Sequence, residues 1–415
     1  MTLKEKRRID QLGHGIVPEG YKRTKVGICP EDWVENVLGD IYTERKEPGK
    51  EGLPLLMVSI HSGVSDGEVG EKDLPKRFKR IEDKSQYKRA VVGDLVFNMM
   101  RAWQGAIGSV RTEGMVSPAY VVAKPNDMVD PLFMDYYMKT NRMVHTILRQ
   151  SYGVTDFRLR LYWESFAPIP CVLPPAREQK KIAEILTMQD KIIELEQQKI
   201  EEIKKAKRFF LEKMFPKEGQ AVPEIRFKGF TAPWEQRKLG DVVQITMGQS
   251  PDGSTYSDEP SDYILVQGNA DLQNGWVCPR IWTTQITKKA DAGDLIMSVR
   301  APAGAMGKTA YNAVIGRGVA AIKGNEFIYQ LLVKMDTDGF WKTLSCGSTF
   351  ESLNSDNIKN AEVKIPTTAE QIKIGVFFQY LDNLITLHQR ELAEVEKYKK
   401  ALMQLLLTGL VRVNA

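Results

Sequence analysis

Two long stretches of the chain place hydrophobic residues three and four positions apart, with charged residues between them. One begins near Arg177 and the other near Ala369, and each follows a proline, Pro174 in the first case and Pro366 in the second. This spacing predicts two long α-helices. Because a seven-residue period continues over five heptads in each stretch, we expect the helices to form a coiled coil rather than to lie on a sheet.

The two predicted helices repeat the same seam 192 residues apart, including a lysine at Lys207 and at Lys399. We expect them to pair antiparallel about a pseudo-twofold axis, which would bring Glu196 to His388 as a polar pair that fixes the register. The alternative is that both side chains point to solvent. The expected seam residues are Ile182, Leu186, Ile193, Glu196, Ile200, Ile203, Ile374, Phe378, Ile385, His388, Leu392 and Val395.

The sequence before each helix also occurs twice, in the same order. The matching pairs are WVENVLGD at Trp33 and WEQRKLGD at Trp234, VGDLVFNMMR and AGDLIMSVR, GAIG and GAMG, and SYGVTDFRL and SCGSTFESL. Short runs of β-branched and aromatic residues in these copies predict strands, and Asp130–Gln150 and NEFIYQLLVKM predict helices. We therefore expect an α+β fold, in which two pseudo-repeated α/β units with mixed or antiparallel sheets are separated by two long helices that form an antiparallel coiled coil.

These elements define the expected domain boundaries. Between the repeated anchors the two copies differ, because residues 72–89 are basic whereas residues 247–276 are mainly polar. The two globular domains are therefore expected to present different surfaces. The expected segments are an N-terminal arm (1–22), a first globular domain (23–175), a central helical spacer (176–216), a second globular domain (217–366), a C-terminal helical spacer (367–409) and a tail (410–415).

The composition is that of an ordinary globular protein. Hydrophobic residues make up 42% and charged residues 27% of the 415 positions, a length that predicts two or three domains. No apolar run is long enough for a membrane span and the charged N-terminus is unlike a secretory signal, so the expected location is cytoplasmic. The four cysteines are scattered without a Cys-x-x-Cys pair, which predicts no zinc site among them.

Motifs of catalysis are missing from the sequence. The chain has no phosphate-binding Gly-rich motif, no Asn/Asp-Pro-Pro-Tyr/Phe signature of amino-methyltransferases and no nucleophile elbow. The four histidines have no evident metal or triad partners, and His145 is expected to be structural within the apolar pattern of a helix. We therefore expect no catalytic residue, no metal and no cofactor bound by this chain.

A basic segment offers a binding surface instead. Residues 72–101 contain nine Lys and Arg against four Asp and Glu, interleaved with Phe78 and Tyr87, in a chain of net charge +5. Basic residues at this density neutralise phosphates, and the residues between them can contact bases. The alternative is a solvated, charged loop.

The two Gly-x-Thr stretches, at Gly153 and Gly347, are a second candidate. Arginines follow the first copy, and serine and asparagine follow the second. Arginine reads guanine and asparagine reads adenine, each through two hydrogen bonds. The alternative is a structural turn before the last strand. The candidate DNA-binding residues from the two copies are Lys76, Arg77, Lys79, Arg80, Lys84, Lys88, Arg101, Gln104, Thr155, Arg158, Arg160, Gln249, Ser250, Arg300, Thr349, Ser352 and Asn354.

The ordered markers together resemble the specificity subunit of type I restriction–modification systems over nearly the whole chain. The markers are Trp-x4-Leu-Gly-Asp, Gly-Asp-Leu, Gly-x-Thr and the Pro-Pro/Thr-x2-Glu-Gln start of each long helix, and every one of them occurs twice. The resemblance implies that each globular domain is a target recognition domain that reads one half of a split DNA sequence. It also implies that the helices space the two halves and dock two modification subunits.

The same resemblance places the chemistry in other chains. The modification subunits would carry S-adenosylmethionine and methylate adenine at N6, and restriction subunits that use ATP and Mg²⁺ would join the larger complex. Because the variable segments of the two domains differ, we expect an asymmetric target. The alternative is a non-catalytic coiled-coil adaptor whose globular domains bind protein partners, whereas the missing motifs disfavour a stand-alone methyltransferase.

Overall fold

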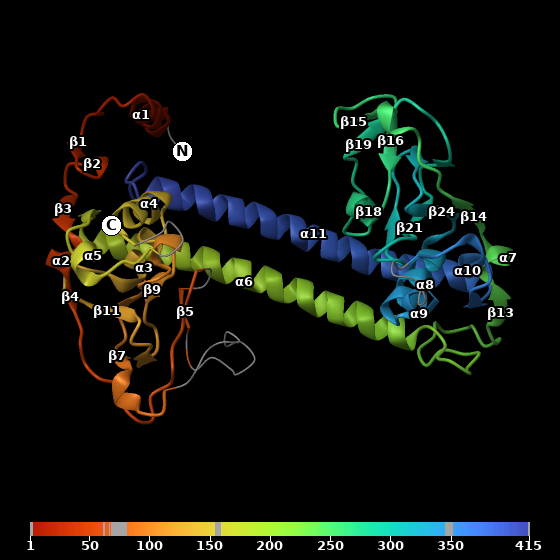
Figure 1. Cartoon of the computed structure of the whole chain (residues 1–415), viewed down its shortest axis with the longest axis horizontal. Helices are drawn as coiled ribbons and strands as arrows, with labels where there is room; N and C mark the ends of the chain where they lie inside the picture. The colour runs from red at the N-terminus through yellow and green to blue at the C-terminus, as the bar shows by residue number, and fades with distance from the viewer. Residues whose placement is uncertain are drawn as a thin grey trace. The chain divides into compact units, whose positions relative to one another are not determined.

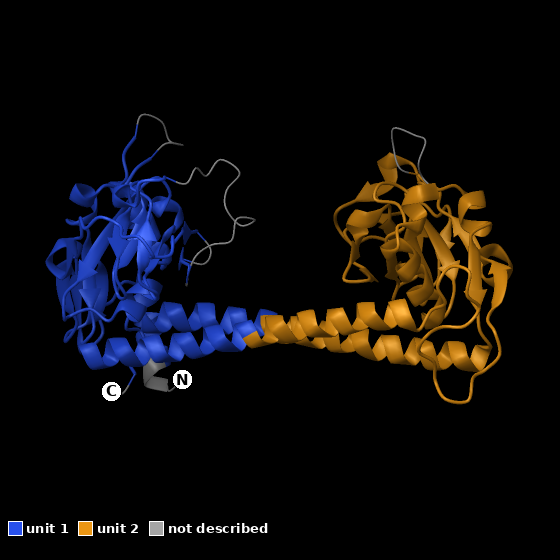
Figure 2. Cartoon of the chain, turned by 90° about the horizontal axis from the view of Figure 1, so that it is seen from below, with its two compact units in different colours: residues 1–194, 393–415 blue, residues 195–392 orange. Residues whose placement is uncertain are grey.

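In the computed structural model the chain forms two compact units, described over residues 3–60, 63–65, 67, 81–153, 159–344 and 352–413. Unit 1 comprises residues 1–194 and 393–415, and unit 2 comprises residues 195–392 (Figure 2). Two long helices, α6 (Ala176–Lys213) and α11 (Thr368–Leu406), each belong partly to both units. They begin and end within a few residues of the two predicted helical spacers. No helix among the described residues is both long and apolar enough to cross a membrane.

Unit 1 is built on a four-stranded antiparallel sheet with the order β4-β11-β8-β9 (Figure 1). Two-stranded pairs β1-β2, β3-β12, β5-β6 and β7-β10 accompany it. Its strands are β1 (Tyr21–Thr24), β2 (Gly27–Pro30), β3 (Val34–Val37), β4 (Tyr42–Glu44), β5 (Val58–Ser59), β6 (Gly63–Val64), β7 (Lys88–Ala90), β8 (Leu95–Asn98), β9 (Ile107–Ser109), β10 (Gly114–Val116), β11 (Tyr120–Pro125) and β12 (Pro170–Leu173). Its helices besides α6 and α11 are α1 (Leu3–Gly13), α2 (Leu38–Ile41), η2 (Lys84–Gln86), η3 (Ala102–Gln104), α3 (Pro131–Tyr137), α4 (Asn141–Gln150) and α5 (Trp163–Phe166).

Unit 2 repeats this plan and adds to it. Its six-stranded sheet has the order β14-β24-β21-β22-β18-β17, and the first four strands correspond to β4-β11-β8-β9 of unit 1. The two-stranded pair β13-β25 corresponds to β3-β12. A five-stranded sheet, β15-β19-β16-β23-β20, has a parallel pair between β16 and β23. The strands are β13 (Glu235–Lys238), β14 (Gln244–Met247), β15 (Tyr256–Ser257), β16 (Tyr263–Val266), β17 (Leu272–Gln273), β18 (Trp276–Val277), β19 (Ile281–Thr283), β20 (Lys289–Ala290), β21 (Leu295–Ser298), β22 (Met306–Lys308), β23 (Ala313–Ile315), β24 (Val319–Lys323) and β25 (Glu362–Ile365). The helices are α7 (Leu239–Val242), η4 (Gly253–Thr255), η5 (Asn269–Asp271), α8 (Glu326–Thr337), α9 (Phe340–Leu344) and α10 (Ser355–Lys359). The predicted α+β class with mixed sheets is thus confirmed.

The repeated Gly-Asp-Leu motif forms the same turn in both units. Gly93 and Gly293 have φ values of 94° and 98°, a left-handed conformation that favours glycine. The following aspartate accepts a hydrogen bond from the backbone N–H three residues earlier, at 2.8 Å for Asp94 and 2.9 Å for Asp294. The motif therefore recurs because each copy turns the chain into a buried strand, β8 or β21.

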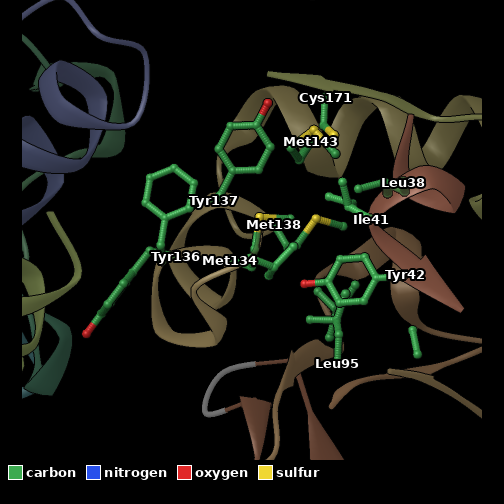
Figure 3. Close-up of a cluster of buried hydrophobic side chains, with 14 of the residues drawn as sticks. Leu38, Ile41, Tyr42, Leu95, Met134, Tyr136, Tyr137, Met138, Met143 and Cys171 are labelled. Carbon is green, nitrogen blue, oxygen red and sulfur yellow. The ribbon is translucent and has the colours of Figure 1, made fainter. Parts of the chain in front are cut away.

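The core of unit 1 joins the sheet to the helices that cover it. Figure 3 shows Ile41 and Tyr42 beside the sulfur-containing side chains of Met134 and Met138. Leu186 of α6 and Leu406 of α11 belong to the same buried cluster, so the long helices contribute to the core of the globular body. Burying this much apolar surface is what holds the helix ends against the domain.

The repeated Glu-Gln pair attaches each long helix to its globular body. The amide of Gln179 donates to the carbonyl of Pro174 (2.9 Å), and Gln371 donates to Pro366 in the same way (3.0 Å). The buried Glu178 accepts from the indole of Trp33 (3.2 Å). The Glu-Gln pair therefore recurs for a structural reason at the start of α6 and α11.

Three details of the expected elements differ from the structure. The single helix expected over Asp130–Gln150 is two helices, α3 and α4, because the hydroxyl of Thr140 caps a new helix by accepting from the N–H of Met143. His145 is exposed on α4 rather than part of its apolar face. In addition, the expected end of the N-terminal arm at residue 22 falls inside strand β1.

Candidate nucleic-acid interface

In unit 1, two of the candidate segments lie side by side. The N–H of Leu161 donates to the carbonyl of Met99 (2.9 Å), which brings the chain around Arg160 to the turn that carries Arg101 and Gln104. All three of these polar side chains are exposed. The structure therefore places the segments that carry Arg101, Gln104 and Arg160 side by side, and we call these three exposed residues patch 1.

Two tyrosines accompany patch 1. The guanidinium of Arg160 donates to the hydroxyl of Tyr162 (3.3 Å), and the Tyr162 ring lies 5.4 Å from that of Tyr152. Tyr152 is 57% exposed, so its ring is accessible from solvent. Cationic and aromatic groups that share one surface can contact both phosphates and bases.

Unit 2 builds its counterpart with the same backbone contact. The N–H of Leu353 donates to the carbonyl of Val299 (2.9 Å), and Arg300 and Ser352 form an isolated β-bridge beside it. Arg300 and Ser352 are exposed, as Arg101 is in unit 1. Arg101 lies two residues after the accepting carbonyl of Met99, whereas Arg300 lies one residue after that of Val299, so the two arginines follow the same contact without being strictly equivalent. We call the unit 2 surface patch 2.

Gln249 and Ser250 extend patch 2 through a second loop. The N–H of Gln249 donates to Ile315 (2.8 Å), and the hydroxyl of Ser250 accepts from the N–H of Arg317 (3.1 Å). The backbone N–H of Val299, the residue before Arg300, donates to the carbonyl of Gly318 (2.8 Å). The loop that carries Arg317 therefore also contacts the end of the strand before Arg300. These contacts assemble the two predicted segments and one further arginine.

Arg317 is a candidate that the sequence reasoning missed. It is exposed between two glycines, and a Cβ on Gly318 would lie 2.0 Å from the carbonyl oxygen of Gln267. A Cβ on Gly316 would lie 3.4 Å from Gln267 and from Ser250, which is ordinary contact. Position 318 therefore requires glycine for this close packing, and Arg317 is the large side chain at the tip. The signal in the sequence was the Gly-Arg-Gly triplet.

Three candidate residues have contacts that give them a structural role. The ammonium of Lys88 donates to the carbonyl of Tyr120 (2.7 Å), and burial lowers the pKa of this lysine. The side-chain oxygen of Asn354 accepts from the N–H of Asn357 (2.8 Å) and caps α10, so it is not free for a paired contact with adenine. The ammonium of Lys84 lies 5.7 Å from the centre of the Tyr87 ring.

The remaining predicted DNA-binding residues lie outside the part of the chain that the structure describes. They are Lys76, Arg77, Lys79, Arg80, Thr155, Arg158 and Thr349.

The two long helices are antiparallel within each unit. In unit 2, His388 Nδ1 lies 2.8 Å from Glu196 Oε2, the polar pair that the repeat predicted, and Lys207 donates to Asp382 (2.6 Å). In unit 1, Lys399 donates to Asp190. None of the twelve predicted seam residues is exposed.

Comparison with known proteins gives these geometries a context. The sequence profile of the type I restriction modification DNA specificity domain matches residues 120–205 and 232–397. The chain is 29% identical over 432 residues to the protein named as the MjaX specificity subunit of a type I restriction enzyme from Methanocaldococcus jannaschii, covering 95% of this chain and 97% of that protein. It is 24% identical over 434 residues to the MjaVIII specificity subunit from the same organism, with coverage of 95% and 97%.

Solved structures show the same fold. A chain from a structure described as the basis of complex assembly and conformational transition of the type I R-M system has a TM-score of 0.57 at 21% identity, covering 92% of this chain and 99% of that one. The S subunit of a type I restriction-modification system from M. genitalium has a TM-score of 0.55 at 13% identity, with coverage of 92% and 97%.

Proposed function

Since the chain belongs to the family of type I restriction–modification specificity subunits, we propose that it recognises a bipartite, asymmetric DNA target and directs partner subunits to it. The partners are two modification subunits, which methylate adenine at N6 using S-adenosylmethionine, and restriction subunits that use ATP and Mg²⁺. This chain binds none of these cofactors and is not an enzyme. The globular domains at 23–175 and 217–366 act as the two target recognition domains.

The observation that carries this proposal is the pair of patches built on one plan with different side chains. Each contains an exposed arginine shortly after a buried strand, Arg101 after β8 or Arg300 after β21. Patch 1 adds Arg160 with two tyrosines, whereas patch 2 adds Gln249 and Arg317. Since different side chains read different base edges, the two half-sites differ.

The test is a map of N6-methyladenine in the genome of cells that carry this gene and of cells that lack it. The expected result is a set of methylated adenines within one split, non-palindromic sequence, all lost on deletion. An unchanged methylation map after deletion contradicts the proposal.

A second measurement separates DNA recognition from an adaptor that binds only proteins. Binding of the purified chain to a duplex that contains the mapped sequence should weaken steeply as salt rises, because phosphate contacts release counterions. An adaptor of the alternative kind shows no duplex binding at low salt.

A further inference from the structure

A histidine and two glutamates from both long helices come together in unit 2. His388 Nδ1 on α11 lies 2.8 Å from Glu196 Oε2 on α6 and 3.1 Å from Glu391 Oε2, one turn further along α11. The ligand atoms of the three residues all lie within 4.8 Å of one another. We propose that Glu196, His388 and Glu391 form a binding site for one divalent transition-metal ion of the zinc class, which would clamp α6 to α11.

The donor set selects the class of metal. Imidazole together with carboxylate suits zinc and neighbouring transition metals, whereas magnesium and calcium prefer oxygen ligands alone. Zinc bound tetrahedrally at about 2.0–2.2 Å holds adjacent ligand atoms roughly 3.3 Å apart. The two observed separations at His388 Nδ1, 2.8 Å and 3.1 Å, are slightly shorter than this, and the carboxylates of Glu196 and Glu391 lie within 4.8 Å of each other. Side-chain rotations can adjust these separations while the helix backbones stay in place.

The burial of the three side chains leaves one side open. The side chains of Glu196 and His388 are 11% and 19% exposed, whereas that of Glu391 is 50% exposed. Three protein ligands with a water at an open fourth position are a common zinc arrangement. A cation can therefore enter from the Glu391 side without opening the helix pair.

Protonation in the cluster is compatible with a cation. Nδ1 of His388 faces both carboxylates, so all three ligand atoms converge on one point. When the metal binds, Nδ1 coordinates and the imidazole keeps its single proton on Nε2.

Lys199 gives the site an internal test. Its ammonium donates to Glu196 Oε1 (2.8 Å), which leaves Oε2 directed at His388. In the 192-residue repeat, Lys199 occupies the position equivalent to Glu391. A fixed positive charge beside the site opposes a second cation, so Lys199→Gln should strengthen metal binding while Glu391→Gln should abolish it.

The experiment is titration of Zn²⁺, and of Co²⁺ as a spectroscopic substitute, into the chelator-treated full-length chain, followed by calorimetry and visible absorption. The expected result is one ion per chain and a metal-dependent rise of the unfolding temperature. Binding should be lost in His388→Gln and in Glu391→Gln, retained in His145→Gln and tighter in Lys199→Gln.

Glu391→Gln is the decisive variant because this half-exposed side chain can change without loss of the fold. Absence of saturable binding in the unaltered chain overturns the proposal, as does undiminished binding in His388→Gln or Glu391→Gln. None of these readouts depends on DNA or on partner subunits, so the site can fail while the proposed function stands.

Discussion

The ammonium of Lys207 on α6 donates a hydrogen bond to Asp382 on α11, 2.6 Å away, within unit 2. In unit 1 the helices exchange these roles, because Lys399 on α11 donates to Asp190 on α6. Lys207 and Lys399 are 192 residues apart in the sequence, and so are Asp190 and Asp382. The lysines that interrupt the hydrophobic seam are therefore the donors of two ion pairs, one in each unit, at positions that the 192-residue repeat relates.

Replacing Lys207 by methionine should lower the free energy of unfolding by about 1–3 kcal/mol, because Asp382 loses a partner in a partly buried position. Asp382 would keep a hydrogen bond from Gln330 (2.8 Å). Urea unfolding followed by circular dichroism measures the loss. Replacing both Lys207 and Asp382 by methionine should recover part of it, and a double variant less stable than the single one would contradict this account.

Stability in acid should depend on Glu224. The ammonium groups of Lys213 and Lys217 lower the pKa of Glu224 to about 2. A carboxylate whose pKa is depressed in the folded state adds stability above its ordinary pKa, and this is lost as pH falls from about 4.5 toward 2. Urea midpoints measured across this range should fall more for the unaltered chain than for Glu224→Gln. Parallel pH profiles would show that the contact contributes nothing.

Gly318→Ala should disturb the patch 2 loop. The new Cβ would lie 2.0 Å from the carbonyl oxygen of Gln267, so the backbone must move, at a cost of about 1–3 kcal/mol. Binding to a duplex that contains the mapped target should weaken accordingly. The matched control is Gly253→Ala, where a Cβ meets nothing within 4 Å. Equal affinities of the two variants for the duplex would show that the close packing at Gly318 is not needed for DNA binding.

Arg317→Ala should weaken target binding by about 1–3 kcal/mol and relax specificity at one base of one half-site. Methylation of targets with single-base changes reports the position that is relaxed. Arg237→Ala is the control, since Arg237 is an exposed arginine on β13, outside patch 2. A uniform loss of affinity across all sequences would instead assign Arg317 to a phosphate.

The sequence was sufficient for the helices, their seam and the duplicated plan, because periodicity and a constant offset are visible without coordinates. It also predicted the pair of Glu196 and His388, since these two residues are 192 positions apart and occupy the same place in the two copies. It did not reveal Glu391 as a partner, although the residue lies one helical turn after His388. That contact depends on rotamers, which periodicity does not specify.

The individual binding candidates were harder to predict for a different reason. Composition marks lysine and asparagine as available for DNA, but tertiary contacts occupy Lys88 with a carbonyl and Asn354 with a helix cap. Arg317 was missed because a single arginine between two glycines does not form a basic cluster in the sequence. Its exposure follows from close backbone packing, which only the folded chain displays.

Residues from the C-terminal segment of α11 and beyond complete the body formed by the N-terminal part of the chain. The hydroxyl of Tyr21 donates to the carbonyl of Gly409 (2.6 Å), and Arg412 donates to Asp32 (2.7 and 2.9 Å) and to the buried Glu178 (2.8 Å). On the ribosome, residues 195–392 emerge before this segment does. The body that begins first is therefore the last to be finished, and until then its apolar docking surface for residues 393–413 stays open to chaperones and proteases.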